Sequence, residues 1–86
     1  MSEVTVTLLL FAKARELVGK SSVSTSIPTR LTYQELVSRL ESELPILERL
    51  NRTFVLSLNE DYLEQEQEIV LTSGDEIAVI PPISGG

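Results

Sequence analysis

The chain contains one long helical pattern, and strand-like patterns lie on both sides of it. Thr32 and Glu35 have the spacing of a capping box, and apolar residues then recur at helical intervals until Pro45. A sheet built from the flanking strands has to bury its apolar side chains against this helix, because no second helical pattern of that length is present. We therefore expect one main helix packed across a sheet.

Alternation of apolar and polar residues predicts the strands of that sheet. The pattern alternates from Val4 to Leu8 and is then wholly apolar through Phe11, which is typical of a strand that becomes buried on both faces. Pro28 ends a second alternating stretch, since proline cannot donate to a strand ladder. The predicted strands cover residues 4–11, 22–27, 54–58, 62–63, 69–71 and 76–80.

Two shorter helical segments complete the predicted order of elements. Residues 12–18 are rich in helix formers and are followed by Gly19, so they predict a short helix with a glycine cap. Residues 46–50 predict a short helical or irregular crossover. This order is that of an α+β domain with a mixed sheet, in which the first and last strands pair in the middle. We place the domain at residues 1–80.

The residue types that are missing exclude several classes of protein. The 86 residues include no cysteine and no histidine, which removes the thiolate nucleophile, the imidazole base and the two commonest transition-metal ligands. A net charge of −6 repels phosphate backbones and anionic lipid and favours partners with basic surfaces. We therefore expect no bound metal or cofactor, and neither nucleic acid nor membrane as a partner.

The beginning of the chain gives an expectation about location. Glu3 stands where a secretory leader would carry positive charge, and the apolar segment that follows is too short to span a membrane. No disulfide is possible without cysteine. We expect the protein in the cytosol.

Residues 81–86 follow the last predicted strand as an extended tail. Pro81 and Pro82 restrict φ and favour an extended arm, whereas Gly85 and Gly86 carry no Cβ. Fully extended, these residues reach on the order of 20 Å, far enough to carry the terminal carboxylate into a partner's tunnel. The alternative is a frayed terminus, because two terminal glycines arise by chance in roughly one chain in 200.

The carboxylate of Gly86 is the candidate reactive group. A carboxylate is a poor electrophile, because its charge and resonance must be overcome before a nucleophile can add. ATP-dependent adenylation removes that barrier, and a sulfur donor can then displace the adenylate and leave a thiocarboxylate. The chain supplies only the carboxylate and the arm in this chemistry, which agrees with its lack of cysteine and histidine.

Three stretches carry a family resemblance, and they are residues 10–19, 55–59 and 74–86. With them the chain resembles the small subunits of molybdopterin synthases, the MoaD-like sulfur carriers of the ubiquitin-like β-grasp family. The last stretch is the most specific, since related thiamine-pathway carriers also end in two glycines but usually lack the lead-in Pro81-Pro82-Ile83-Ser84. The resemblance implies a β-grasp fold with a protruding Gly-Gly tail.

The resemblance also implies partners and site residues. An E1-like adenylyltransferase and sulfurtransferase would consume ATP to adenylate and then thiocarboxylate Gly86. The tail, Pro81, Pro82, Ile83, Ser84 and Gly85, would then enter the large catalytic subunit of a heterotetramer that converts cyclic pyranopterin monophosphate to the dithiolene. The small subunit is not itself catalytic in such a complex.

An apolar patch that docks against partners is implied by the same resemblance, and by motif position it includes Phe11, Tyr62 and Ile80. Core or half-exposed packing is the alternative for each of these three residues. Three further functions stay open at this point: a thiamine-type carrier, a ubiquitin-like protein modifier, and a non-covalent interaction module whose tail is incidental.

Overall fold

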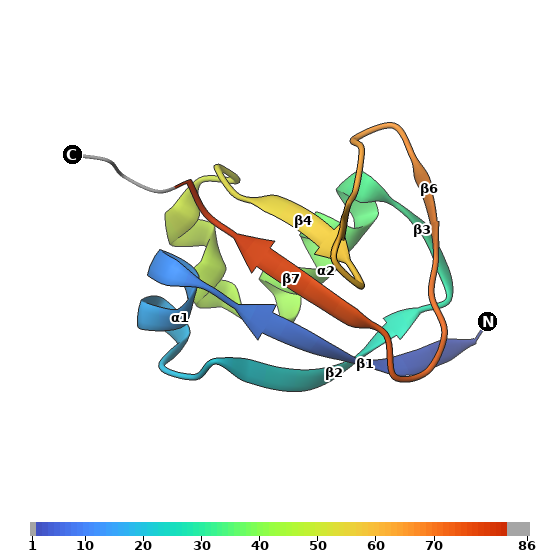
Figure 1. Cartoon of the computed structure of the whole chain (residues 1–86), viewed down its shortest axis with the longest axis horizontal. Coiled ribbons are helices and arrows are strands. Elements are labelled where there is room, and N and C mark those ends of the chain that lie inside the picture. The colour runs from blue at the N-terminus through green and yellow to red at the C-terminus, as the bar shows by residue number, and fades with distance from the viewer. Residues whose placement is uncertain (1, 83–86) are drawn as a thin grey trace.

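The computed structural model describes residues 2–82, and within this range the chain forms seven strands, two α-helices and one 3₁₀ helix (Figure 1). The helices are α1 (Ala12–Val18), α2 (Tyr33–Glu43) and the 3₁₀ helix η1 (Pro45–Leu50). The strands are β1 (Glu3–Leu10), β2 (Ser22–Pro28), β3 (Arg30–Thr32), β4 (Val55–Leu58), β5 (Asp61–Tyr62), β6 (Glu68–Val70) and β7 (Glu76–Ile80). This order confirms the predicted α+β class.

Five of the strands form one mixed sheet in the order β2-β1-β7-β4-β5. β1 and β7 are parallel, and Leu10 is the partner of Val79 in their register, whereas the other neighbouring strands are antiparallel. The predicted pairing of the first and last strands is therefore confirmed, and β7 is the middle strand. A separate two-stranded ladder joins β3 to β6, and the sequence pattern did not predict it.

The hydrophobic core lies between α2 and one face of the sheet, and Figure 1 shows α2 behind the strands. Alternate residues of β1 and β7 point into it because side chains alternate along a strand. Each of these strand residues is at most 1% exposed: Val6, Leu8, Leu10, Ile77 and Val79. Helix α2 contributes Leu36 and Leu40, which are both fully buried. We call this the inner face of the sheet.

Local signals mark the start of α2 and the end of α1, as predicted. Thr32 Oγ1 accepts a hydrogen bond from the Glu35 amide at 3.1 Å, and the Thr32 amide donates to Glu35 Oε1 at 2.8 Å. This is the capping box expected at the start of α2. Helix α1 ends at Gly19, whose φ of 83° lies in the left-handed region that glycine adopts readily.

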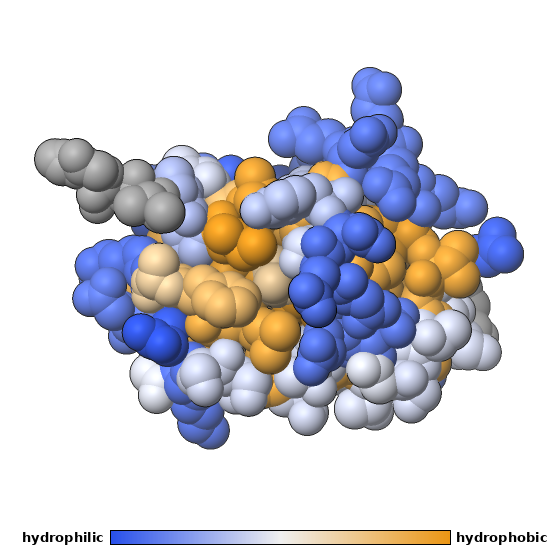
Figure 2. Space-filling view, in the orientation of Figure 1, coloured by the Kyte–Doolittle hydropathy of each residue, from blue (hydrophilic) through white to orange (hydrophobic). Residues whose placement is uncertain are grey.

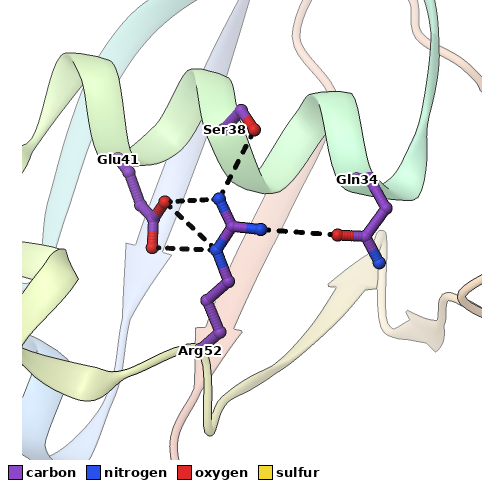
Figure 3. Close-up of polar contacts among 4 residues, drawn as sticks. All are labelled: Gln34, Ser38, Glu41 and Arg52. Carbon is purple, nitrogen blue, oxygen red and sulfur yellow. Dashed lines mark hydrogen bonds and ion pairs between the residues drawn. The ribbon is translucent and has the colours of Figure 1, made fainter.

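Arg52 fastens the connection between η1 and β4 to helix α2 (Figure 3). Asn51 and Arg52 both have positive φ, 52° and 55°, and they turn the chain sharply after η1. Arg52 Nη2 then donates to Glu41 Oε1 at 2.8 Å, and Nε contacts both oxygens of the same carboxylate. Weaker contacts of 3.5 Å reach Gln34 and Ser38 on α2. The turn thereby has a defined position against the main helix.

Two details of the predicted strands are wrong. Pro28 is the last residue of β2 rather than a residue beyond it, and it pairs with Glu3. This is tolerated because β2 is an edge strand, where a missing amide donor faces no partner. The end of β1 is also not buried on both faces, since Leu9 is half-buried and Phe11 is 46% exposed. The helix α2 packs on the opposite face only, so the face that carries Leu9 stays open.

Candidate functional site

The predicted reactive group, the carboxylate of Gly86, lies outside the described residues, as do the predicted tail residues Ile83, Ser84 and Gly85. Pro81 and Pro82 are described, and they follow β7 directly. Pro81 is buried and Pro82 is exposed. The buried part of the chain thus extends to Pro81. We call Pro81 and Pro82 the tail root.

The tail root lies at the end of the sheet where α1 and η1 meet (Figure 1). A groove of about 560 Å³ is lined there by Pro81 and Pro82, by Lys13 and Glu16 of α1, and by Leu50 of η1. Because β1 runs parallel to β7, both strands deliver the chain to this same end. The amide of Phe11, just past β1, donates to the carbonyl of Val79 at 3.3 Å. The root of the tail is therefore beside a predicted interface residue.

The outer face of the sheet, opposite α2, carries a patch of apolar and small side chains. Strand register places one row of them side by side across β1, β7, β4 and β5: Leu9, Ala78, Ser57 and Tyr62. Val55 and Ile80 form the next pair on this face. Figure 2 shows apolar residues gathered over these strands, with hydrophilic residues around them.

An open hollow of about 200 Å³ lies in this outer face. Its apolar and small lining residues are Leu9, Phe11, Ser57, Tyr62, Ala78 and Ile80. Phe11 and Tyr62 are 46% and 70% exposed, although both are large hydrophobic residues. The structure thus brings Phe11, Tyr62 and Ile80 to one place, and their role in binding a partner stays a prediction.

Sequence reasoning missed four residues of this face, namely Leu9, Val55, Ser57 and Ala78. The signal that could have found them is the alternation along each strand. Val79 points into the core, so its neighbours Ala78 and Ile80 have to point outward. The same argument applies to Val55, which is 47% exposed beside the fully buried Leu56.

A tight turn between β4 and β5 borders the hollow. Asn59 and Glu60 are its two central residues, and both have positive φ, 49° and 76°, because Leu58 pairs directly with Asp61. The Asn59 side chain holds the turn against β7, since its Oδ1 accepts from the Glu76 amide at 2.9 Å and its Nδ2 donates to Asp75 at 3.1 Å. The turn therefore places Glu60 beside the hollow, where Glu76 also contributes to the lining.

Asp75 is the acceptor at the centre of this arrangement. Its Oδ2 accepts from the Thr72 amide at 2.8 Å, and its Oδ1 accepts from the Asn59 amide group and the Thr72 hydroxyl. These hydrogen bonds, with that from the Thr72 backbone the largest cause, lower the pKa of Asp75 from its ordinary value. A structural role in the turn accounts for this carboxylate.

Neither metal clusters nor long apolar helices are found in residues 2–82. No group of three or more acidic side chains in this range is arranged to hold a metal ion. No helix in it has the length and apolar character needed to cross a bilayer. The features that distinguish this part of the chain are the apolar outer face and the tail root.

Comparisons of sequence find a family and close relatives. The model of the ThiS family matches residues 8–86 of the chain. A protein of Arabidopsis thaliana named molybdopterin synthase sulfur carrier subunit is 40% identical, over 99% of this chain and 86% of its own length. One of the same name from Dictyostelium discoideum is 38% identical, over 92% of this chain and 93% of its own length.

Comparisons of structure agree with the predicted fold. The crystal structure of SAMP1 from Haloferax volcanii has a TM-score of 0.76 at 24% identity, covering 95% of this chain and 99% of that one. A chain in a complex of subunits 1 and 2 of the molybdopterin-converting factor from Helicobacter pylori has a TM-score of 0.67 at 19% identity, covering 96% and 100%. These likenesses confirm the ubiquitin-like β-grasp fold.

Proposed function

The chain belongs to the ThiS family, and on that premise we propose that it is the sulfur carrier subunit of a molybdopterin synthase. Relatives of that name are similar to it over nearly the whole of both chains, which favours the molybdenum branch over a thiamine-type carrier. The structural observation that carries the proposal is the position of the tail root. It lies at the end of the sheet where the apolar outer face reaches Phe11.

The proposed chemistry takes place at the Gly86 carboxylate. One of its oxygens attacks the α-phosphate of an ATP molecule held by an E1-like activating enzyme, and pyrophosphate leaves. A sulfur donor then adds to the acyl adenylate and displaces AMP, so that one carboxylate oxygen is replaced by sulfur. The terminal glycines suit this chemistry because no Cβ obstructs the approach to the final carbonyl.

The outer face is the proposed docking surface for the large subunit. Its exposed apolar side chains include Phe11 and Tyr62, and Ile80 leads directly into the tail root. A partner that covers this face could receive residues 81–86 in its active site, where sulfur passes to cyclic pyranopterin monophosphate. The proposal includes a cytosolic heterotetramer with the large subunit, and ATP bound by the activating enzyme and not by this chain.

Intact-protein mass spectrometry tests the proposal directly. Co-expression with the activating enzyme and a sulfur source should yield a chain in which one oxygen of Gly86 is replaced by sulfur. Deletion of Gly86 should abolish both this mass change and sulfur transfer to the large subunit, while the thermal unfolding of the domain stays unchanged. A second variant with one residue added after Gly86 keeps both glycines. It should also fail in sulfur transfer, because the reactive carbonyl is displaced.

Two results would contradict the proposal. The first is a carboxylate that stays unmodified in the presence of an active E1-like enzyme. The second is full sulfur transfer by the extended variant, since it would show that the position of the terminal carbonyl is unimportant. Covalent adducts to lysine that resist reducing agents would instead indicate a ubiquitin-like modifier.

A further inference from the structure

Two carboxylates lie among the apolar residues of the outer-face hollow. Glu60 and Glu76 are both exposed, and both line the hollow together with Phe11 and Tyr62. We propose that this hollow receives an arginine side chain of the large molybdopterin synthase subunit. The inference rests on the proposed function, and it specifies the chemistry of the partner surface that the outer face selects.

Neither carboxylate has a cation of its own within residues 2–82. The ion pairs of this range join Arg30, Arg39 and Arg52 to other glutamates, and the side chains of Glu60 and Glu76 accept no hydrogen bond there. The chain also carries a net charge of −6, which attracts a basic surface over long range. Charge complementarity therefore favours a positively charged occupant of the hollow.

The backbone conformation at position 60 does not explain why this residue is a glutamate. Its φ of 76° occupies a hairpin position that strongly favours glycine, because a Cβ is strained in the left-handed region. The first central residue, Asn59, is suited to its place and bonds to β7. Glycine would serve the turn better than Glu60 does, so the carboxylate is the feature that needs an explanation.

The other walls of the hollow favour arginine over lysine. A guanidinium stacks on an aromatic face and donates a planar fork of hydrogen bonds to a carboxylate, whereas an ammonium is a compact, strongly hydrated charge. Phe11 and Tyr62 offer exposed rings beside the two carboxylates. The volume of about 200 Å³ is below the range of small-molecule pockets and suits a single side chain.

Isothermal titration calorimetry with the purified large subunit from the same organism tests the inference. Glu60→Gln and Glu76→Gln each remove a charge with little change in shape, and we expect each to weaken binding about tenfold or more at low salt. Binding of the unchanged chain should weaken as salt rises, and the two variants should show a smaller dependence. Glu66→Gln is the matched control, since it removes the same charge outside the hollow and should bind as the unchanged chain does.

Glu60→Gly separates binding from folding. It relieves the left-handed strain, so its Tm should be equal to or higher than that of the unchanged chain, while its affinity should fall as in Glu60→Gln. A higher Tm with unchanged affinity would overturn the inference, because Glu60 would then be a turn residue only. Equal affinity of both glutamine variants and the control would overturn it as well.

The two levels of the argument fail in different ways. If the unchanged chain does not bind the large subunit, the proposed function and this inference fall together. If it binds and Glu60→Gln and Glu76→Gln bind equally well, only this inference falls. Single arginine-to-lysine substitutions on the large subunit test the choice of arginine. If the two glutamine variants lose affinity but none of these substitutions does, the occupant of the hollow is not an arginine.

Discussion

At the scale of single residues, the charged side chain of Asp75 stabilises the fold through its hydrogen bonds. Its carboxylate accepts hydrogen bonds from Thr72 and Asn59, and so connects the turn before β7 to the hairpin between β4 and β5. These bonds stabilise the charged form and lower the pKa of Asp75 in the folded chain. A group with a lowered folded pKa stabilises the fold above its unfolded pKa and loses that contribution as the pH falls.

This gives a prediction about pH. The unchanged chain should be more stable than Asp75→Asn near neutral pH, because asparagine cannot provide the charged acceptor. The difference in the free energy of unfolding should shrink as the pH falls below about 4, the ordinary pKa of an aspartate, and continue to fall through the lower folded pKa. Urea denaturation followed at a series of pH values measures it. A difference that stays constant over that range would assign the effect of the substitution to shape alone.

The residue-level predictions that hold are those with local causes. The capping box at Thr32 and the glycine cap at Gly19 each depend on residues within one turn of the chain, so the sequence contains their whole explanation. The positive φ of Glu60 depends instead on the pairing of β4 with β5. Residues 59–61 favour a turn between the two predicted strands, but without glycine at position 60 nothing in the sequence indicates a positive φ there.

At the scale of elements, helix α2 has a start that can be tested separately from its packing. Thr32→Ala removes the side-chain acceptor for the Glu35 amide, and we expect a loss of about 1 kcal/mol in the free energy of unfolding. Ser42→Ala is the control on the same helix, since Ser42 is exposed and alanine has the higher helix propensity. Chemical denaturation should show a loss for the first variant and none for the second. Equal stabilities would mean that core packing alone positions the helix.

The longest strands have the clearest sequence patterns. β1 and β7 show clear patterns because several residues of each alternate between core and surface. A strand was predicted at residues 69–71, where β6 lies, but β3 and its ladder with β6 were missed, because Leu31 is the single apolar residue of β3 and one apolar residue in three defines no period. Such short strands form because the surrounding fold brings them together, and that information is not local.

At the scale of the whole molecule, the fold has one helix-covered face and one open face. Helix α2 covers the inner face, and the core includes most of the large apolar side chains of β1 and β7. The predicted interface residues Phe11 and Tyr62 are exposed and line the hollow of the open outer face. The family motif located these residues along the chain, but only the strand register places them at one hollow. Leu9 and Ala78 join them there because β1 and β7 are paired in parallel.

Because one face of the sheet is covered and the other is open, the same substitution should lower the stability of the chain much more on the inner face than on the outer face. Val79→Thr buries a hydroxyl in the core, where Val79 is fully buried, and should cost about 1–3 kcal/mol in the free energy of unfolding. Val55→Thr places the same hydroxyl on the outer face, where Val55 is 47% exposed, and should change stability by less than about 0.5 kcal/mol. Urea denaturation of the pair compares the faces directly, with size and strand propensity matched. A similar loss at Val55 would show that the outer face contributes to the stability of the free chain and is not reserved for a partner.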